Sequence, residues 1–175
     1  MAERLALSGG APLRTTPFHR WPDWDASERA ALSGVLEDGS WGGYPSPNKY
    51  AGRFAQEFSS YLGSAHGVCC TNGSVAIELA LQAAGIGPGD EVIVPAYTFV
   101  ATASSAALVR AVPIFVDVSP ETYCIDPERI AEAITPRTRA IIVVHLACNM
   151  ADMDAILALA KKHSLIVIED CAHAH

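Results

Sequence analysis

The sequence predicts an α/β fold: a mostly parallel sheet with helices on both of its faces. From residue 68 onward, short apolar runs rich in β-branched residues alternate with segments of helical periodicity. The runs lack the polar alternation of a half-exposed strand, which indicates strands buried on both faces. Alternating strands and helices are typical of parallel strands joined by right-handed crossovers.

The N-terminal part precedes this alternation. Residues 1–25 are rich in proline, glycine and tryptophan and show no periodicity, so we expect an extended arm. Ser27 is a candidate N-cap for a helix that ends at Gly39. A loop rich in glycine and proline then leads to a second helix over about residues 50–62.

The alternating part follows without an internal repeat or a linker, which indicates one domain. The expected strands cover residues 68–70, 91–94, 112–116, 140–144 and 165–168. The expected helices cover residues 74–84, 98–109, 127–134 and 153–162.

Composition narrows the function classes. The chain has 175 residues, of which 50% are hydrophobic and 18% charged, enough for one globular domain with a core. Its net charge is -7 and its basic residues are scattered, so nucleic acid and anionic membranes are not expected partners. No apolar stretch reaches the roughly 18 residues that span a bilayer. We expect a cytoplasmic enzyme of small metabolites.

The cysteines predict neither disulfides nor a metal cage. They are Cys69, Cys70, Cys124, Cys148 and Cys171. Their number is odd and no pair has C-x-x-C spacing, so free thiols that pack mostly as small buried hydrophobes are expected.

Several nucleotide and hydrolase motifs are absent from the sequence. It has no G-x-G-x-x-G after the first expected strand, no G-x-x-x-x-G-K-[ST] and no G-x-S-x-G. The chain therefore lacks the residues that define nicotinamide-binding Rossmann domains, P-loop proteins and α/β-hydrolases.

A short polar turn, Thr71-Asn72-Gly73-Ser74, follows the first expected strand and opens a helix. Gly73 allows close backbone approach to an anion, Ser74 adds a hydroxyl, and the first helical N–H groups are free to bind phosphate. In the alternative interpretation, Thr71 or Ser74 is only an N-cap.

Two further groups fall on the same edge of the sheet. Residues 95–102 place two aromatic residues and two threonines after the strand that ends at Val94. Asp170 follows the strand over residues 165–168, at the edge where ligands of open α/β sheets bind. A phosphate site, a stacking ring and a carboxylate together suit pyridoxal 5'-phosphate (PLP), whose pyridine nitrogen a carboxylate keeps protonated. His173 lies close enough in sequence to contact the ring.

At these residues the sequence resembles the sugar and cyclitol aminotransferases of the DegT/DnrJ/StrS type, which have the fold-type I architecture of aspartate aminotransferase. The resemblance covers nearly the whole chain. Its most specific stretches are Thr71-Asn72-Gly73-Ser74 and residues 87–95, 115–118, 134–138, 144–146, 151–154 and 168–173.

The resemblance implies roles for individual residues. Asn72, Gly73 and Ser74 would bind the cofactor phosphate, and Phe99 would stack on the ring. Asp170 would hold the pyridine nitrogen, with His173 near the 3-oxygen. The substrate-approaching segment of the family corresponds to Trp41, Gly42 and Tyr44.

The resemblance also divides the chain. It assigns residues 1–36 to the N-terminal arm and first helix, and residues 37–175 to the N-terminal part of an incomplete PLP-binding large domain. The Schiff-base lysine and the C-terminal small domain of the family lie beyond residue 175, so no catalytic residue is expected here. Lys161 and Lys162 are interpreted as solvated charges at a helix C-terminus. Lys49 is expected in a loop near the substrate segment, with nothing to orient it toward a carbonyl, and the chain alone is predicted to be inactive.

The chain departs from the family pattern in the loop after the strand over residues 140–144. The glycine that the family commonly has shortly after the strand histidine is missing after His145, which leaves the loop shape open. In the sheet order that the resemblance implies, the strand over residues 68–70 would pair with a strand beyond residue 175, while the other four strands pair among themselves. Its unpaired backbone groups would cost roughly 1 to 3 kcal/mol each, so we predict marginal stability or aggregation. The intact enzyme is expected to be a homodimer.

The expected function is transfer of an amino group from glutamine or glutamate to a keto-sugar or cyclitol ketone. The alternatives are a sugar dehydratase of the same fold, or an inactive fragment that binds a phosphate ligand or an intact paralogue. The sequences of residues 21–24 and 170–173 resemble cyclitol and aminohydroxybenzoate members more than nucleotide-sugar members.

Overall fold

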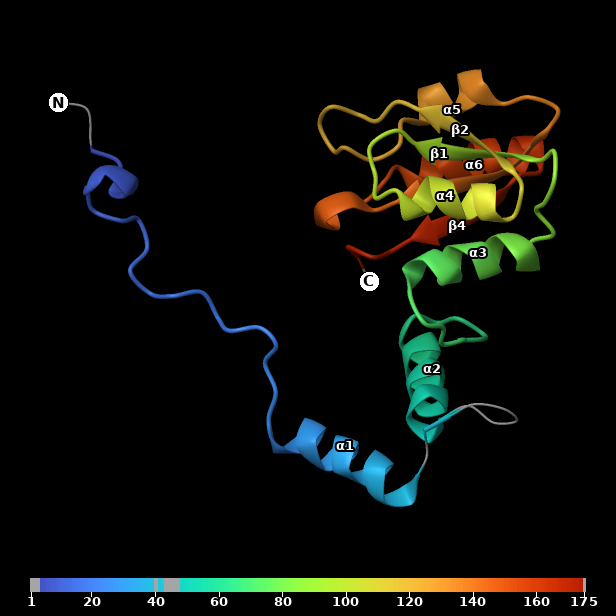
Figure 1. Ribbon diagram of the computed structural model, residues 1–175. Coiled ribbons are helices and arrows are strands. Elements are labelled where there is room, and N and C mark those ends of the chain that lie inside the picture. Colours follow the sequence, from blue (N-terminus) through green and yellow to red (C-terminus); the bar gives the residue numbers. More distant parts are fainter. Residues whose placement is uncertain (1–3, 40, 43–47, 175) are drawn as a thin grey trace. The chain divides into compact units, whose positions relative to one another are not determined.

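The computed structural model describes residues 4–39, 41–42 and 48–174 (Figure 1). By compactness the chain separates into two units, Met1–Val68 and Cys69–His175. The division at residues 36 and 37 that the family resemblance suggests stays a prediction.

The first unit contains a short 3-10 turn, η1 (Ala6–Ser8), and two helices, α1 (Ala26–Asp38) and α2 (Lys49–Tyr61). The arm predicted over residues 1–25 therefore contains one helical turn, η1, and its described residues outside η1 form neither helix nor strand.

The N-cap of α1 is Asp25, so the assignment of Ser27 was wrong. The Asp25 carboxylate accepts a hydrogen bond from the Ser27 N–H at 2.6 Å, and the Glu28 carboxylate accepts one from the Asp25 N–H at 2.8 Å. This reciprocal capping box satisfies two backbone donors at once, which a cap at Ser27 would not do.

Neither α1 nor α2 contains a buried residue. One stripe of α2 is aromatic: the rings of Phe54 and Phe58 stack at 5.4 Å, and those of Phe58 and Tyr61 at 6.4 Å. Lys49, expected in a loop, is the first residue of α2 and forms an ion pair with Asp38.

The second unit contains a parallel sheet with the strand order β2-β1-β3-β4. Its strands are β1 (Glu91–Pro95), β2 (Val112–Val116), β3 (Thr138–Val144) and β4 (Ile166–Asp170). This arrangement confirms the predicted fold class.

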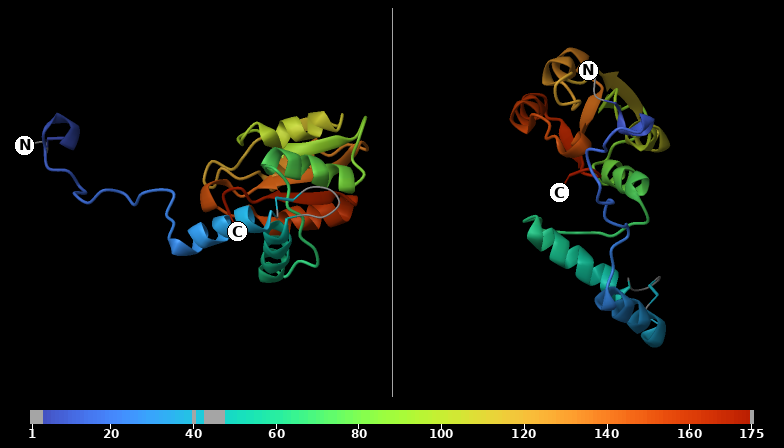
Figure 2. Two further views of the ribbon diagram at one scale, coloured as in Figure 1. Left: turned by 60° about the horizontal axis from the view of Figure 1, so that its bottom comes forward. Right: turned by 90° about the vertical axis from the view of Figure 1, so that its left-hand side faces the viewer.

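Helices cover both faces of the sheet (Figure 1 and Figure 2). They are α3 (Gly73–Ala83), α4 (Ala101–Leu108), α5 (Pro127–Ala133) and α6 (Met153–His163). Alternate strand residues point to opposite faces. Val92, Val94 and Ile142 pack with α3 and α4, and Ile93, Ile141 and Val143 pack with α5 and α6.

The strand expected over residues 68–70 is absent, so that prediction was wrong. Val68 is 85% exposed, and Cys69 and Cys70 are exposed too. The described sheet has no strand beside this segment. Without a neighbouring strand its backbone N–H and C=O groups have no hydrogen-bond partners in the protein, so a strand there is not stable in water. The other four expected strands do pair among themselves, as predicted.

The prediction of mostly buried cysteines was also wrong. Only Cys124 is buried, and the other four thiols are exposed. Cys148 and Cys171 lie in the segments that follow β3 and β4, whereas Cys69 and Cys70 lie in the segment before α3.

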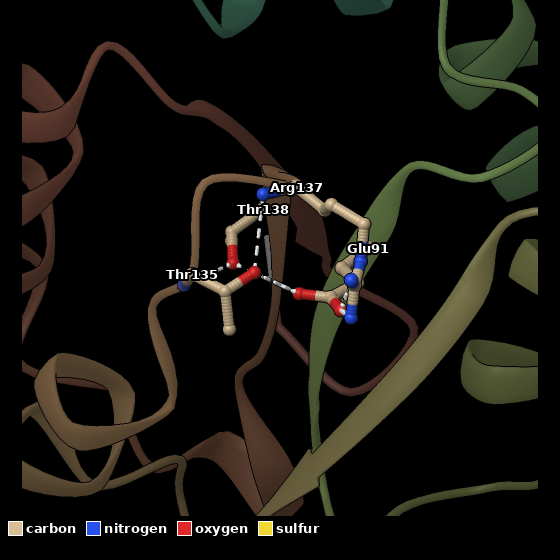
Figure 3. Close-up of polar contacts among 4 residues, drawn as sticks. All are labelled: Glu91, Thr135, Arg137 and Thr138. Carbon is tan, nitrogen blue, oxygen red and sulfur yellow. Dashed lines mark hydrogen bonds and ion pairs between the residues drawn. The ribbon is translucent and has the colours of Figure 1, made fainter.

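The amino edge of the sheet is held by a polar cluster (Figure 3). The Glu91 carboxylate, at the start of β1, is 3% exposed. It accepts hydrogen bonds from the Thr135 hydroxyl and from the Arg137 guanidinium. The Thr135 hydroxyl is the larger cause, and Arg137 the next, of a Glu91 pKa below its ordinary value of 4.5. The cluster joins the starts of β1 and β3.

Lys161 and Lys162 lie in the last turn of α6, which leads into the start of β4. They are therefore near the amino edge, as expected, and far along the strand from Asp170. Among the described residues, every helix falls short of the length and apolarity that crossing a bilayer requires.

Candidate functional site

A pocket of about 690 Å³ opens at the carboxyl edge of the sheet. All of the residues expected to bind the cofactor line it: Asn72, Gly73, Ser74, Phe99, Asp170 and His173. They come from the start of α3, the segment after β1, and the end of β4. Its volume lies within the range of about 300 to 1,000 Å³ that is typical of small-molecule sites.

The first turn of α3 forms one wall. Asn72, rather than Thr71 or Ser74, is its N-cap, and its side chain accepts a hydrogen bond from the Val75 N–H at 3.0 Å. The N–H groups of Gly73 and Ser74 are the first of the helix and have no intrahelical acceptor. A Cβ atom added to Gly73 would meet no atom within 4 Å. The turn therefore offers open space and N–H donors to an anion.

Asp170 is the last residue of β4 and is held at both carboxylate oxygens. Oδ2 accepts a hydrogen bond from the Thr102 hydroxyl at 3.2 Å, and Oδ1 accepts one from the Ala172 N–H at 3.1 Å. Thr102 is fully buried. The two donors fix the plane of the carboxylate where β4 meets the pocket.

His173 is exposed and faces the same pocket. Its Nδ1 accepts a hydrogen bond from the Ala147 N–H at 3.2 Å. In the neutral ring the proton is then on Nε2, which leaves an N–H donor for a ligand.

The sequence did not predict the shape of the loop after β3, because the family glycine is missing there. Residues Leu146–Cys148 form a short 3-10 turn, η2, in which Ala147 and Cys148 have φ values of 50° and 65°. These left-handed conformations favour glycine. Neighbouring contacts hold them, including the Cys148 thiol bond to the His173 carbonyl at 3.1 Å.

Aromatic rings border the pocket. Phe99 is 74% exposed, so its ring is accessible to a ligand. Tyr97 also lines the pocket and packs on Tyr123 with ring centroids 5.9 Å apart.

The expected substrate residues lie elsewhere in the chain. Trp41 and Gly42 belong to the first unit, so their predicted role stays a prediction. Tyr44 lies outside the described residues.

A second polar group lies on the opposite face of the end of β4. Ligand atoms of His145, Glu169 and Cys171 lie within 4.8 Å of one another, close enough to share a metal ion. However, His145 Nδ1 accepts from the Ala151 N–H at 3.2 Å, which places the ring proton on Nε2, 3.0 Å from the Glu169 carboxylate. A metal at Nε2 would need that proton on Nδ1, facing the Ala151 donor. This chemistry favours a His–Glu hydrogen bond over a metal.

The thiol beside this pair is poorly suited to act as a nucleophile. Partial burial, and next the carboxylates of Glu169 and Asp170, raise the pKa of Cys171 above its ordinary value. Because the thiolate is the reactive form, the raised pKa disfavours reaction near neutral pH.

Sequence reasoning missed several residues that shape the pocket. Thr102 was noticed only as one of two threonines, while Ser105 and Ala147 were not singled out. Thr102 and Ser105 are hydroxyl residues three positions apart on a helix whose other residues are Ser104, four alanines and Leu108. That spacing was the available signal, since it places both hydroxyls on one face.

Residues 22–175 match the model of the DegT/DnrJ/EryC1/StrS aminotransferase family. The chain is 48% identical over 178 residues to an L-glutamine:2-deoxy-scyllo-inosose aminotransferase of Streptomyces lividus, covering 100% of this chain and 42% of that protein.

Solved structures agree. A 3-amino-5-hydroxybenzoic acid synthase matches with a TM-score of 0.85 and 44% identity, covering 91% of this chain and 41% of that one. NtdA of Bacillus subtilis, solved with bound cofactor PMP, matches with a TM-score of 0.78 and 40% identity, covering 83% of this chain and 33% of that one. The chain thus spans less than half the length of these relatives. It belongs to the DegT/DnrJ/EryC1/StrS aminotransferase family.

Proposed function

We propose that the protein carrying this chain is a PLP-dependent aminotransferase that moves an amino group from glutamine or glutamate to a cyclitol ketone or a keto-sugar. The observation that carries the proposal is the convergence of the α3 N-terminus, Phe99 and Asp170 on one pocket. The named activities of relatives at nearly half identity support the same chemistry.

The residues present fit PLP. The first N–H groups of α3 and the space above Gly73 suit a phosphate. The exposed ring of Phe99 suits a flat heteroaromatic ring. Asp170 presents a carboxylate whose orientation is already set by two hydrogen bonds.

Bound PLP supplies an electron sink for amino-group transfer. In this chain Asp170 would accept a hydrogen bond from the pyridine N–H and so keep the ring nitrogen protonated, while Gly73 and Ser74 would hold the phosphate by backbone donors. His173, with its Nδ1 engaged by Ala147, would donate from Nε2 toward the ring oxygen. Phe99 would cover one ring face and exclude water there. The proton transfers of the reaction need a base that we place outside residues 1–175.

For the acceptor we favour a cyclitol ketone of the scyllo-inosose type. Curated relatives with this printed activity match the whole chain at 46% and 48% identity. The described pocket of about 690 Å³ is lined by all six expected cofactor residues and by none of the expected substrate residues, so it does not discriminate between acceptors. We further propose a cytoplasmic homodimer.

The test is a reaction with the full-length protein. Purified protein with PLP and L-glutamine is given 2-deoxy-scyllo-inosose, scyllo-inosose or a nucleotide-linked keto-sugar, and products are identified by mass spectrometry. We expect an aminated cyclitol that depends on PLP and glutamine. Amination of the nucleotide sugar alone would show that the acceptor is a nucleotide-linked keto-sugar and not a cyclitol ketone. Loss of a hydroxyl group without amination would establish the dehydratase alternative.

The 175-residue chain is the matched control. We predict that it shows no turnover, and that borohydride reduction after PLP addition links no cofactor to Lys49, Lys161 or Lys162. A reduced adduct at any of these lysines would contradict the placement of the reactive lysine outside the chain.

A further inference from the structure

Helix α4 carries two buried hydroxyl groups that the cofactor contacts do not use. Thr102 and Ser105 are both 0% exposed. They are three positions apart, so they lie on one face of the helix. A buried hydroxyl is costly unless it is hydrogen-bonded, so the partners of these two side chains define what they do.

The partners belong to the two ends of the pocket. The Ser105 hydroxyl donates to the Ser74 carbonyl oxygen at 3.0 Å, in the first turn of α3. The Thr102 hydroxyl donates to Asp170 Oδ2 at 3.2 Å, at the end of β4. One helical turn of α4 therefore touches both the anion-binding turn and the carboxylate.

The hydrogen-bond direction near Asp170 follows from counting protons. An ionised carboxylate only accepts, so the single Thr102 proton goes to Asp170. The Thr98 and Thr102 hydroxyl oxygens are 2.9 Å apart, and Thr98 must then donate to Thr102. The chain of donors runs from Thr98 through Thr102 to the carboxylate and leaves Asp170 one preferred orientation.

We propose that Thr102 and Ser105 are positioning residues that set the separation and orientation of Asp170 and the α3 N-terminus to match the pyridine nitrogen and phosphate of PLP. This inference rests on the proposed function. It predicts separable effects: Ser105 acts on the phosphate end of the ligand, and Thr102 acts on the ring-nitrogen end.

The test measures cofactor affinity of the full-length apoprotein by fluorescence titration. The probes are PLP, pyridoxal, which lacks the phosphate, and 1-deaza-PLP, which lacks the ring nitrogen. Thr102→Val is expected to weaken PLP at least about tenfold, as for a lost hydrogen bond to a charged group, but to leave 1-deaza-PLP nearly unchanged. Ser105→Ala is expected to weaken PLP about threefold to tenfold and to leave pyridoxal nearly unchanged.

Three controls separate positioning from folding. Thr102→Ser keeps the hydroxyl and should restore most of the PLP affinity, while Ser104→Ala removes a neighbouring hydroxyl of the same helix and should change none of the affinities. Thermal unfolding is followed for every variant. If Thr102→Val does not fold, Ser105→Ala, measured with PLP and with pyridoxal, still carries the comparison.

The outcomes distinguish this inference from the proposed function. If the parent protein binds no PLP, the proposed function fails. If the parent binds PLP and both variants bind it equally well, the positioning inference alone is overturned. Equal weakening of PLP and 1-deaza-PLP by Thr102→Val would also overturn it, because the effect would then not pass through the ring nitrogen.

Discussion

Single buried polar residues set both edges of the sheet. At the carboxyl edge, the buried Thr102 hydroxyl orients the Asp170 carboxylate by a hydrogen bond. At the amino edge, Glu91 joins β1 to the turn before β3 through Thr135 and Arg137. In each case a carboxylate at a strand end is satisfied by a neighbouring element, which aligns the two elements.

The Glu91 cluster predicts a pH-dependent stability. Its folded pKa lies below the unfolded value near 4.5, so its contribution is present above that pH and lost as the pH falls through the folded pKa. We expect Glu91→Gln to lower the urea midpoint clearly at pH 7, with the difference from the parent protein shrinking in acid. Glu132→Gln, in an exposed pair with Arg129, should change the midpoint little. A constant difference at all pH values would show that the carboxylate charge is not involved.

At the scale of elements, caps and turns follow local chemistry closely. Asp25, Asn48, Asn72, Asp126 and Asp152 each cap a helix through a side-chain oxygen. Helix α4 begins without a side-chain cap, and in the loop after β3 the η2 turn is built without glycine and carries two left-handed residues. It is tied to the site by the bond between Ala147 and His173.

The left-handed backbone of Ala147 in η2 predicts that glycine at this position stabilises the protein. Ala147→Gly relieves a left-handed alanine, worth about 1 to 2 kcal/mol, against an entropy cost of about 0.5 to 1 kcal/mol. We expect the free energy of unfolding to rise by roughly 0.5 kcal/mol in urea titrations. Ala158→Gly, at an exposed position inside α6, is the matched control and should lower it by about 1 kcal/mol. Destabilisation of equal size at both positions would contradict the assigned strain.

At the scale of the whole molecule, the two units differ in burial. The second unit contains a core on each face of its sheet. Neither helix of the first unit has a buried residue, and isolated helices of this length are marginal in water. The aromatic stripe of α2 and the exposed segment over residues 68–70 leave apolar surface open to solvent.

This contrast predicts uneven hydrogen exchange in the 175-residue chain. Amides of β1 and β3 should exchange slowest, whereas those of α1 and α2 should exchange at nearly the rate of an unprotected chain. Mass spectrometry of peptic fragments measures both. Protection of α2 equal to that of β3 would contradict the prediction. Protection of α2 in the full-length protein alone would show that its aromatic stripe is covered there.

Much of the second unit could be predicted from sequence because its signals are local. Strands β1 to β4 each contain a continuous run of apolar residues, and the expected helices overlap α3 to α6. All six expected cofactor residues line one pocket, because parallel strands end at the same edge. The substrate role of Trp41, Gly42 and Tyr44 stays a prediction.

The sequence by itself determined the strand and helix order, the edge of the sheet at which the pocket opens, and the family resemblance, since these depend on periodicity and on residues adjacent in the chain. Only the tertiary structure decided the strand order β2-β1-β3-β4 and the contacts by which Thr102 and Ser105 hold the two ends of the pocket. These depend on contacts between segments far apart in sequence, for which hydrophobic periodicity carries no signal.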